Sequence, residues 1–147
     1  MTKALTSIAA LVAVYLATTA IACAQAPPFH KGPVWNCAQI RTKDGRGEDY
    51  MKWVATQWKA QEEALIKGGF AIGYKVLSTV DTRAGEPNIM LCTEFKDMAA
   101  FDVPTAKVDA FMAKRFGSDK KANQEEVARG SMRTVMGDVM LRQLDLK

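Results

Sequence analysis

Residues 70–96, FAIGYKVLSTVDTRAGEPNIMLCTEFK, contain two runs of alternating apolar side chains separated by a turn. The runs 70–80 and 89–96 are rich in β-branched and aromatic residues with a period of two, which is typical of half-buried strands. The connection 83–88, RAGEPN, carries the Gly and Pro of a turn. We therefore predict two antiparallel strands joined as a hairpin.

Strand and helix patterns continue on both sides of this hairpin. Upstream, residues 34–42 alternate like a strand, and residues 48–67 have a helical period that ends before Gly68-Gly69. The downstream elements are a helical turn after Asp97, a helix from Pro104 to Arg115, a charged helix-prone segment 118–130 and a last strand 132–146. The order is β-α-β-β-α-β with an enlarged second helical region, which is the ferredoxin-like order. We predict one α+β domain over 34–147 with a four-stranded antiparallel sheet, preceded by a flexible proline-rich leader at 27–33.

Residues 1–26 have the three parts of a secretory signal peptide. Lys3 gives a positive start, residues 4–22 are apolar, and Ala24-Gln25-Ala26 forms a small-x-small cleavage site. We expect cleavage after Ala26 and export to the periplasm or the medium. No membrane span would then remain.

Two other interpretations of these residues stay open. The apolar run approaches the ~20 residues that cross a bilayer, so the segment could be an uncleaved anchor. Ala20-Ile21-Ala22-Cys23 resembles a bacterial lipobox, although Leu usually stands where this chain has Ala20. The Ala- and Thr-rich composition and the cleavage site favour the signal peptide.

Cleavage at this position leaves Cys37 and Cys92 in an oxidising compartment, where a pair can form one disulfide. The ferredoxin-like order makes the first and third strands neighbours. If these strands run parallel with Thr42 aligned to Lys96 or Asp97, the two cysteines lie opposite one another. We predict a Cys37–Cys92 disulfide, the alternative being two buried thiols.

The composition excludes a disordered tail, a collagen-like fibre and a disulfide-dense miniprotein, and it argues against a nucleic-acid partner. The chain has 147 residues, 48% hydrophobic and 24% charged, with a formal net charge of +4, which is typical of an ordinary soluble domain. Basic side chains of residues 107–121 alternate with acidic ones and no nucleic-acid motif is present, so we expect no nucleic-acid partner. His30 is the single histidine, which excludes a multi-histidine metal site. We expect no metal and no cofactor.

Alternation along the strands sorts their side chains into two faces. The set expected to meet the helices is Asn36, Ala38, Ile40, Phe70, Ile72, Tyr74, Val76, Ile89, Leu91, Thr93, Phe95, Val135, Val139 and Leu141. The opposite set mixes charged and apolar side chains: Trp35, Cys37, Gln39, Arg41, Ala71, Gly73, Lys75, Leu77, Met90, Cys92, Glu94, Lys96, Met136, Asp138, Met140 and Arg142. This second face must be solvated, covered by a partner or used as a cleft.

The chain resembles the dimeric α/β-barrel proteins over residues 34–147. The resemblance rests on the element order, the Trp-rich first helix ending in Gly-Gly, the strand FAIGYK (70–75) and the closing MGDVMLR (136–142). It implies a homodimer in which two ferredoxin-like sheets pair face to face. The superfamily includes cofactor-free monooxygenases of polyketide quinones, muconolactone isomerases, haem-binding enzymes and stress-related proteins. Its haem-binding members take a histidine ligand from a helix, whereas His30 lies in the leader.

The open face supplies the candidate functional residues. We expect the charged group Arg41, Glu94, Asp138 and Arg142 to be catalytic, and Trp35, Gln39, Lys75, Met90, Met136 and Met140 to bind ligand. An arginine would hold an oxyanion while Glu94 or Asp138, kept partly protonated by burial, exchanged a proton. The alternative is a salt-bridge lattice that holds the dimer together. Trp53 and Trp58 could line a ligand site, but their helical spacing favours the core.

Two hypotheses about function follow from this sorting of the faces. In the first, the barrel binds a small hydrophobic carbonyl-bearing molecule, or oxidises or isomerises it without a cofactor. In the second, the protein is a non-catalytic structural or stress protein of the envelope. The sequence carries no activated nucleophile, metal set or cofactor fingerprint, so binding is favoured over catalysis.

Overall fold

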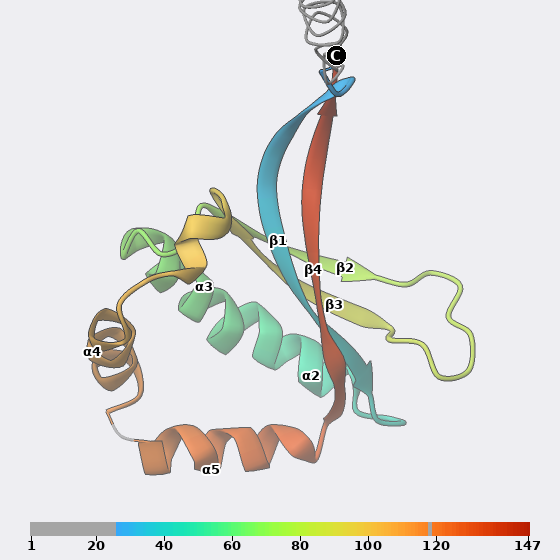
Figure 1. Cartoon of the computed structure of the whole chain (residues 1–147). Coiled ribbons are helices and arrows are strands. Elements are labelled where there is room, and N and C mark those ends of the chain that lie inside the picture. The colour runs from blue at the N-terminus through green and yellow to red at the C-terminus, as the bar shows by residue number, and fades with distance from the viewer. Residues whose placement is uncertain (1–25, 118) are drawn as a thin grey trace, which may run out of the picture.

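The computed structural model describes residues 26–117 and 119–147, and the predicted signal peptide therefore lies almost wholly outside the described residues (Figure 1). The elements follow the predicted order. They are β1 (Phe29–Thr42), α2 (Gly47–Trp53), the π-helical turn η1 (Val54–Trp58), α3 (Lys59–Lys67), β2 (Gly73–Ser78), β3 (Ile89–Phe95), the 3-10 turn η2 (Met98–Phe101), α4 (Thr105–Phe116), α5 (Asp119–Gly130) and β4 (Arg133–Leu146).

The four strands form one sheet in the order β2-β3-β1-β4, and every neighbouring pair is antiparallel. This strand order and the helices between the strands confirm the α+β, ferredoxin-like fold. The expectation that β1 and β3 run parallel was wrong. β1 and β2 run in the same direction because a helix joins them, and the β2–β3 hairpin reverses the chain, so β3 runs against both.

The core lies between the sheet and the helix α2-η1-α3. Its buried side chains are Ile40, Tyr50, Val54, Trp58, Ile89 and Leu91. Trp58 meets Tyr74 of β2 edge to face at 5.4 Å between ring centroids, and Trp53 packs against the same cluster. Trp58 is therefore a core residue, as its helical spacing predicted, whereas Trp53 is half-buried at the border of the core and also lines a pocket beside α5.

The segment 27–33 is not the flexible leader that its prolines predicted. β1 begins at Phe29 and pairs with the end of β4, Phe29 opposite Leu146 and Lys31 opposite Leu144. The backbone N–H of Lys147 also donates to the carbonyl of Pro28 at 3.1 Å. The partner strand lies more than a hundred residues away, so local composition gave no sign of this pairing.

The helices gather on one side of the sheet, and the β1–β4 ribbon extends beyond the other two strands (Figure 1). A polar cluster joins α5 to the rest of the fold. Arg133 at the start of β4 donates to the Tyr50 hydroxyl at 3.1 Å and to the Glu126 carboxylate at 3.0 Å. Arg129 donates to the same carboxylate, so Glu126 of α5 binds both arginines, and Arg133 connects this acid to the core residue Tyr50. In the part of the chain that the structure describes, no helix is long and apolar enough to cross a membrane.

Candidate functional site

The open face is the side of the sheet that faces away from the helices. Directly opposite residues of antiparallel strands share a face, so the registers define its members. They are Trp35, Cys37, Gln39 and Arg41 of β1, Gly73, Lys75 and Leu77 of β2, Met90, Cys92 and Glu94 of β3, and Thr134, Gly137, Val139 and Leu141 of β4.

A disulfide joins Cys37 and Cys92 at the centre of the open face. The two residues are direct register partners, with their Cα atoms 3.9 Å apart, and each is only 1% exposed. This confirms the predicted bond, although the parallel alignment behind it was wrong. The antiparallel register, which places Val34 opposite Phe95 and Ile40 opposite Ile89, brings the same two cysteines together.

Trp35 of β1, Lys75 of β2 and Glu94 of β3 lie next to the disulfide on the open face. The Lys75 ammonium lies over the indole of Trp35, 4.4 Å from the ring centroid. Glu94 stands opposite both Trp35 and Gly73 in the register, and Lys75 stands opposite Cys92. A cation, an aromatic face and a carboxylate therefore occupy adjacent positions beside one buried disulfide.

Glu94 lies directly above Gly73. A Cβ atom added at Gly73 would lie 2.5 Å from Oε2 of Glu94, so the absence of a side chain makes room for the carboxylate. Among the ion pairs and side-chain hydrogen bonds of the described residues, none involves this carboxylate. Its acceptor capacity is thus available to a ligand or a second protein chain.

Arg41 has a structural role at the other end of the strands. Its Nη1 donates to the carbonyl oxygen of Glu86 at 2.6 Å and to that of Arg83 at 3.4 Å. The loop is closed further by Arg83, which donates to the Glu86 carboxylate and thereby lowers the pKa of that carboxyl. The guanidinium of Arg41 therefore holds the turn between β2 and β3 and does not approach Glu94.

A β-bulge reverses the predicted faces of β4. Gln39 pairs with Gly137 and Ile40 pairs with Val135, which leaves Met136 without a partner. Beyond the bulge, Asp138, Met140 and Arg142 stand opposite Ala38, Asn36 and Val34, on the helix side of the sheet. The assignment of these residues to the open face was wrong, and so was that of Val139 and Leu141 to the helix side. Gly137 has a φ of +135°, a conformation that permits the bulge.

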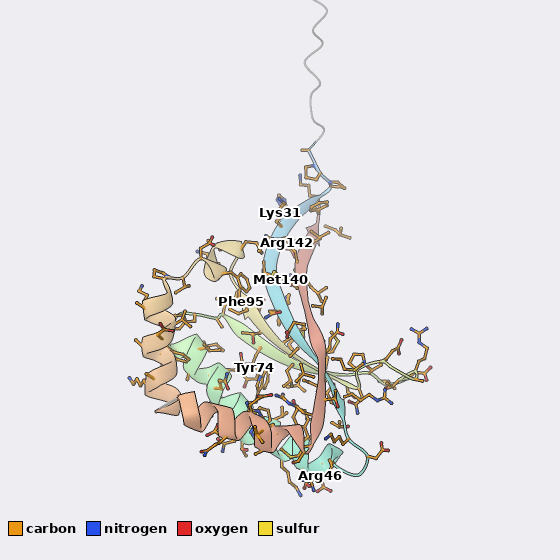
Figure 2. All side chains as sticks on the ribbon, turned by 60° about the horizontal axis from the view of Figure 1, so that its bottom comes forward. Lys31, Arg46, Tyr74, Phe95, Met140 and Arg142 are labelled. Atoms are coloured by element: carbon orange, nitrogen blue, oxygen red, sulfur yellow. A yellow bond between two sulfur atoms is a disulfide. The ribbon has the colours of Figure 1, made fainter. Side chains whose placement is uncertain are left out.

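The bulge separates the four charged residues that the sequence grouped together. Asp138 is exposed on the helix side, and Arg142 donates to the Gly32 carbonyl at 3.5 Å. Figure 2 shows Lys31, Arg142 and Met140 along the β1–β4 ribbon. Of the expected ligand-binding residues, Trp35, Gln39, Lys75 and Met90 lie on the open face, whereas Met140 lies on the helix side and Met136 in the bulge. The open face keeps Glu94 and four of the six ligand-binding candidates; Arg41 also lies on it, but its guanidinium holds the β2–β3 turn.

Sequence reasoning missed one buried acid. Glu62 of α3 is 3% exposed, and its Oε2 accepts a hydrogen bond from the Thr93 hydroxyl at 2.9 Å. Burial raises the pKa of the Glu62 carboxyl, and the bond from Thr93 opposes this only in part. The signal was present in the sequence, because Glu62 follows Trp58 by four residues and so shares its buried helical face.

The comparisons with known proteins give no family for this chain. No family model matches it, and no curated protein does. In the described residues, no three His, Cys, Asp or Glu side chains gather closely enough to hold a metal ion.

Three solved structures resemble the chain at low identity. HapK from Hahella chejuensis has a TM-score of 0.48 and 16% identity over 75% of this chain and 91% of its own. Protein SO0527 from Shewanella oneidensis has a TM-score of 0.48 and 15% identity over 80% and 96%. A dimeric protein of unknown function and ferredoxin-like fold from Bacteroides fragilis has a TM-score of 0.39 and 16% identity over 78% and 97%. The fold assignment itself rests on the strand order of this chain.

Proposed function

We propose that this protein is exported and binds a small hydrophobic, carbonyl-bearing molecule on the open face, between two copies of the chain. The proposal rests on the arrangement of Trp35, Lys75 and Glu94 beside the disulfide. The cation is held by an aromatic ring, and the carboxylate has no partner among the described side chains. Such polar groups on an apolar surface are the usual composition of a ligand site.

Each of the three side chains has a distinct role in this proposal. The Lys75 ammonium carries three donors and can bind a carbonyl or carboxylate oxygen. The indole of Trp35 offers an apolar surface for a planar ligand. Glu94 is an acceptor for a hydroxyl or N–H of the ligand. Met90 and Leu77, in the adjacent row of the sheet, supply adaptable apolar contacts.

A second copy of the chain is the proposed cover of this face. Leu77 and Leu141 are 47% and 48% exposed on the two edge strands, Met90 and Trp35 lie between them on the same face, and exposed apolar side chains gathered on one face are typical of protein interfaces. The charges of this face are also self-complementary. In a two-fold arrangement, Lys75 of one protomer can face Glu94 of the other, because an isologous interface uses the same patch twice.

Export is supported by the leader and the disulfide together. The tripartite pattern of residues 1–26 directs a chain out of the cytoplasm, and an intramolecular disulfide persists in oxidising compartments. Cleavage after Ala26 would leave only two residues before β1. The intact mass of the protein recovered from the envelope tests this step, and a chain that keeps Met1 in the inner membrane would contradict it.

A thermal-shift screen with hydrophobic ketones and quinones tests the binding proposal. We expect a carbonyl compound to raise the Tm of the wild type and its hydrocarbon analogue to do so much less. Lys75→Met and Glu94→Gln should each reduce the affinity about tenfold, since each removes one charge-assisted hydrogen bond.

Matched controls separate the site from the general charge of the protein. Lys59→Met and Glu63→Gln remove the same charges from a surface pair on α3, 3.8 Å apart, and should leave affinity unchanged. If compounds bind equally well to the Lys75 and Glu94 variants, the site is wrong. If no compound binds the folded protein, the hypothesis of a non-catalytic envelope protein is favoured. Conversion of a bound compound to product would instead indicate a cofactor-free oxidation or isomerisation.

A further inference from the structure

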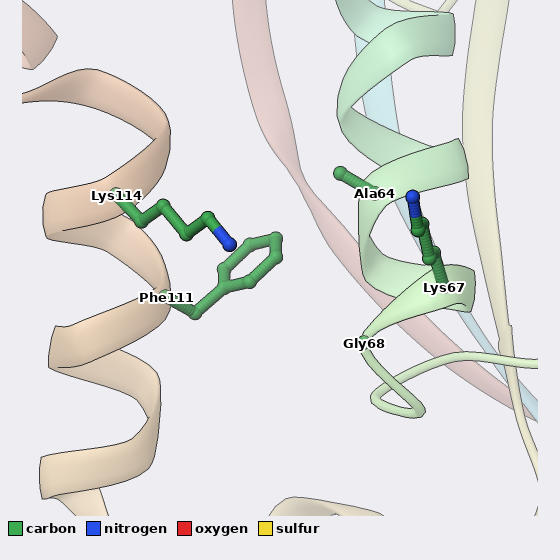
Figure 3. Close-up of a pocket in the computed structure, with 5 residues that line it drawn as sticks. All are labelled: Ala64, Lys67, Gly68, Phe111 and Lys114. Atoms are coloured by element: carbon green, nitrogen blue, oxygen red, sulfur yellow. The ribbon is translucent and has the colours of Figure 1, made fainter.

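We infer a second binding site between α3 and α4, for an amphipathic carboxylate with an apolar aromatic or aliphatic body. The site is a cavity of about 450 Å³ lined by Ala64, Lys67, Gly68, Phe111 and Lys114 (Figure 3). It lies on the helix side of the sheet and shares no residue with the open face, so it does not depend on the function proposed there.

The apolar part of the cavity arises from the local sequence of two helices. Ala64 and Lys67 are three residues apart on α3, and Phe111 and Lys114 are three apart on α4, so each helix presents one apolar residue and one lysine on the same face. In Figure 3 the ring of Phe111 points from α4 toward α3, with the Lys114 side chain beside it.

The end of α3 supports the position of the Phe111 ring. Phe70 packs against Phe111 with 5.1 Å between ring centroids. Gly68 permits this, because an added Cβ would lie 2.9 Å from Cδ2 of Phe70. The contact with Phe70 thus fixes the ring of Phe111, which forms the wall on the side of α4. On the side of α3, the small residues Ala64 and Gly68 leave space for a ligand.

The charges at the cavity determine the class of ligand. Lys67 and Lys114 come from opposite walls, and the ion pairs found within residues 26–117 and 119–147 include neither of them. Lys59, on the same helix, is instead paired with Glu63. Two ammonium groups beside an apolar cavity favour an anion whose body is apolar, and their methylene stems extend the apolar wall. The volume is within the usual range of ligand pockets, roughly 300–1,000 Å³.

Isothermal titration with 4-phenylbutanoate and its neutral analogue 4-phenylbutanol tests the inference. We expect the wild type to bind the carboxylate about tenfold more tightly than the alcohol, since each exposed lysine contributes a modest charge interaction. In the double variant Lys67→Met and Lys114→Met this preference should disappear while the alcohol still binds. Ala64→Trp fills the cavity and should abolish binding of both compounds.

The control variants show whether the effect belongs to this cavity. Lys59→Met on α3 and Lys52→Met on α2 each remove a surface lysine outside the cavity, and both should bind as the wild type does. Circular dichroism establishes that each variant is folded, and the two lysines are exposed, so their replacement leaves the core intact. The inference is overturned if neither compound binds the folded wild type, if the double variant keeps the preference, or if Ala64→Trp binds normally. Binding to anionic vesicles without binding to free 4-phenylbutanoate would also overturn it.

Discussion

Gly73 and Glu94 depend on each other, because the carboxylate occupies the space that a side chain at position 73 would take. Replacing a strand glycine with alanine usually stabilises a protein by about 0.5 to 1 kcal/mol. Here the new methyl group must first displace Glu94. We predict that Gly73→Ala gives little or no gain in the wild type and the full gain in a Glu94→Ala background.

Urea unfolding of the four proteins in this double-mutant cycle measures the coupling, expected at roughly 0.5 kcal/mol or more. Gly47→Ala is the matched control, since the nearest atom to its added Cβ is 3.8 Å away and it should be insensitive to Glu94. Equal effects of Gly73→Ala in both backgrounds would show that the carboxylate does not lie over the glycine.

Glu62 makes the stability of the fold depend on pH. Burial raises the pKa of this carboxyl above its ordinary value of 4.5, so the folded state holds a proton that the unfolded state releases. Its contribution to stability is therefore fully present below pH 4.5 and is lost as the pH rises toward the folded-state pKa. Glu62→Gln keeps an oxygen acceptor for Thr93 and removes the titration.

We predict that Glu62→Gln stabilises the protein by roughly 1 kcal/mol at pH 7.5 and changes the free energy of unfolding little at pH 4. Urea unfolding at the two pH values makes the comparison. Glu63→Gln, an exposed neighbour paired with Lys59, should have a small effect at both. A Glu62→Gln protein that is less stable than the wild type at pH 7.5 would mean that the carboxyl is ionised and favourably bound in the fold.

Helices and strands, which depend on neighbouring residues, were predicted well from the sequence. Pairings between segments far apart in the sequence were not. The helix expected over 48–67 is observed as Gly47–Lys67, and the hairpin strands lie within the predicted runs. Phe29 joins β1 because of a partner at Leu146, which no local pattern reveals.

The faces of β4 show how one residue can overturn a correct strand prediction. The strand begins where expected, but the bulge at Met136 shifts the alternation by one, so every later side chain changes face. A glycine inside a strand often marks a bulge, so Gly137 was the sequence signal for this irregularity. For this reason Asp138 and Arg142 do not lie beside Glu94 as the sequence suggested. Arg41 stays on the open face, but its acceptors are backbone carbonyls of the β2–β3 turn, which the sequence does not reveal.

The disulfide connects β1 to β3 across 55 residues of sequence, including the whole α2-η1-α3 helix. Closing a loop of this size in the unfolded chain stabilises the folded state by about 2 to 4 kcal/mol. We predict that the double variant Cys37→Ala, Cys92→Ala loses stability by this amount in denaturant unfolding. The reduced wild type should match the double variant, which separates the bond from the packing of the sulfur atoms. Two free thiols, detected by alkylation of the unreduced, unfolded wild type, would contradict the bond.

For the whole molecule, the sheet has one covered face and one open face, and the open face determines the expected assembly. Leu77 and Leu141 border a surface whose centre is a buried disulfide, and in an isologous dimer Lys75 of one copy would face Glu94 of the other. We predict a homodimer at micromolar concentration by light scattering. Leu141→Glu should give a folded monomer at the same concentration, because dimerisation would bury the new carboxylate in an apolar border without a partner.

The control for this dimer is Val80→Glu, which introduces the same charge at a fully exposed position of the loop between β2 and β3. That variant should remain dimeric, since its side chain lies outside the open face. Circular dichroism separates dissociation from unfolding, as Leu141 is half exposed and outside the core cluster. A wild type that stays monomeric up to about 100 μM, well above typical dimer dissociation constants, would leave the open face without its cover. The ligand proposed for Trp35, Lys75 and Glu94 would then have to bind to a surface open to solvent, where its charge interactions would be weak.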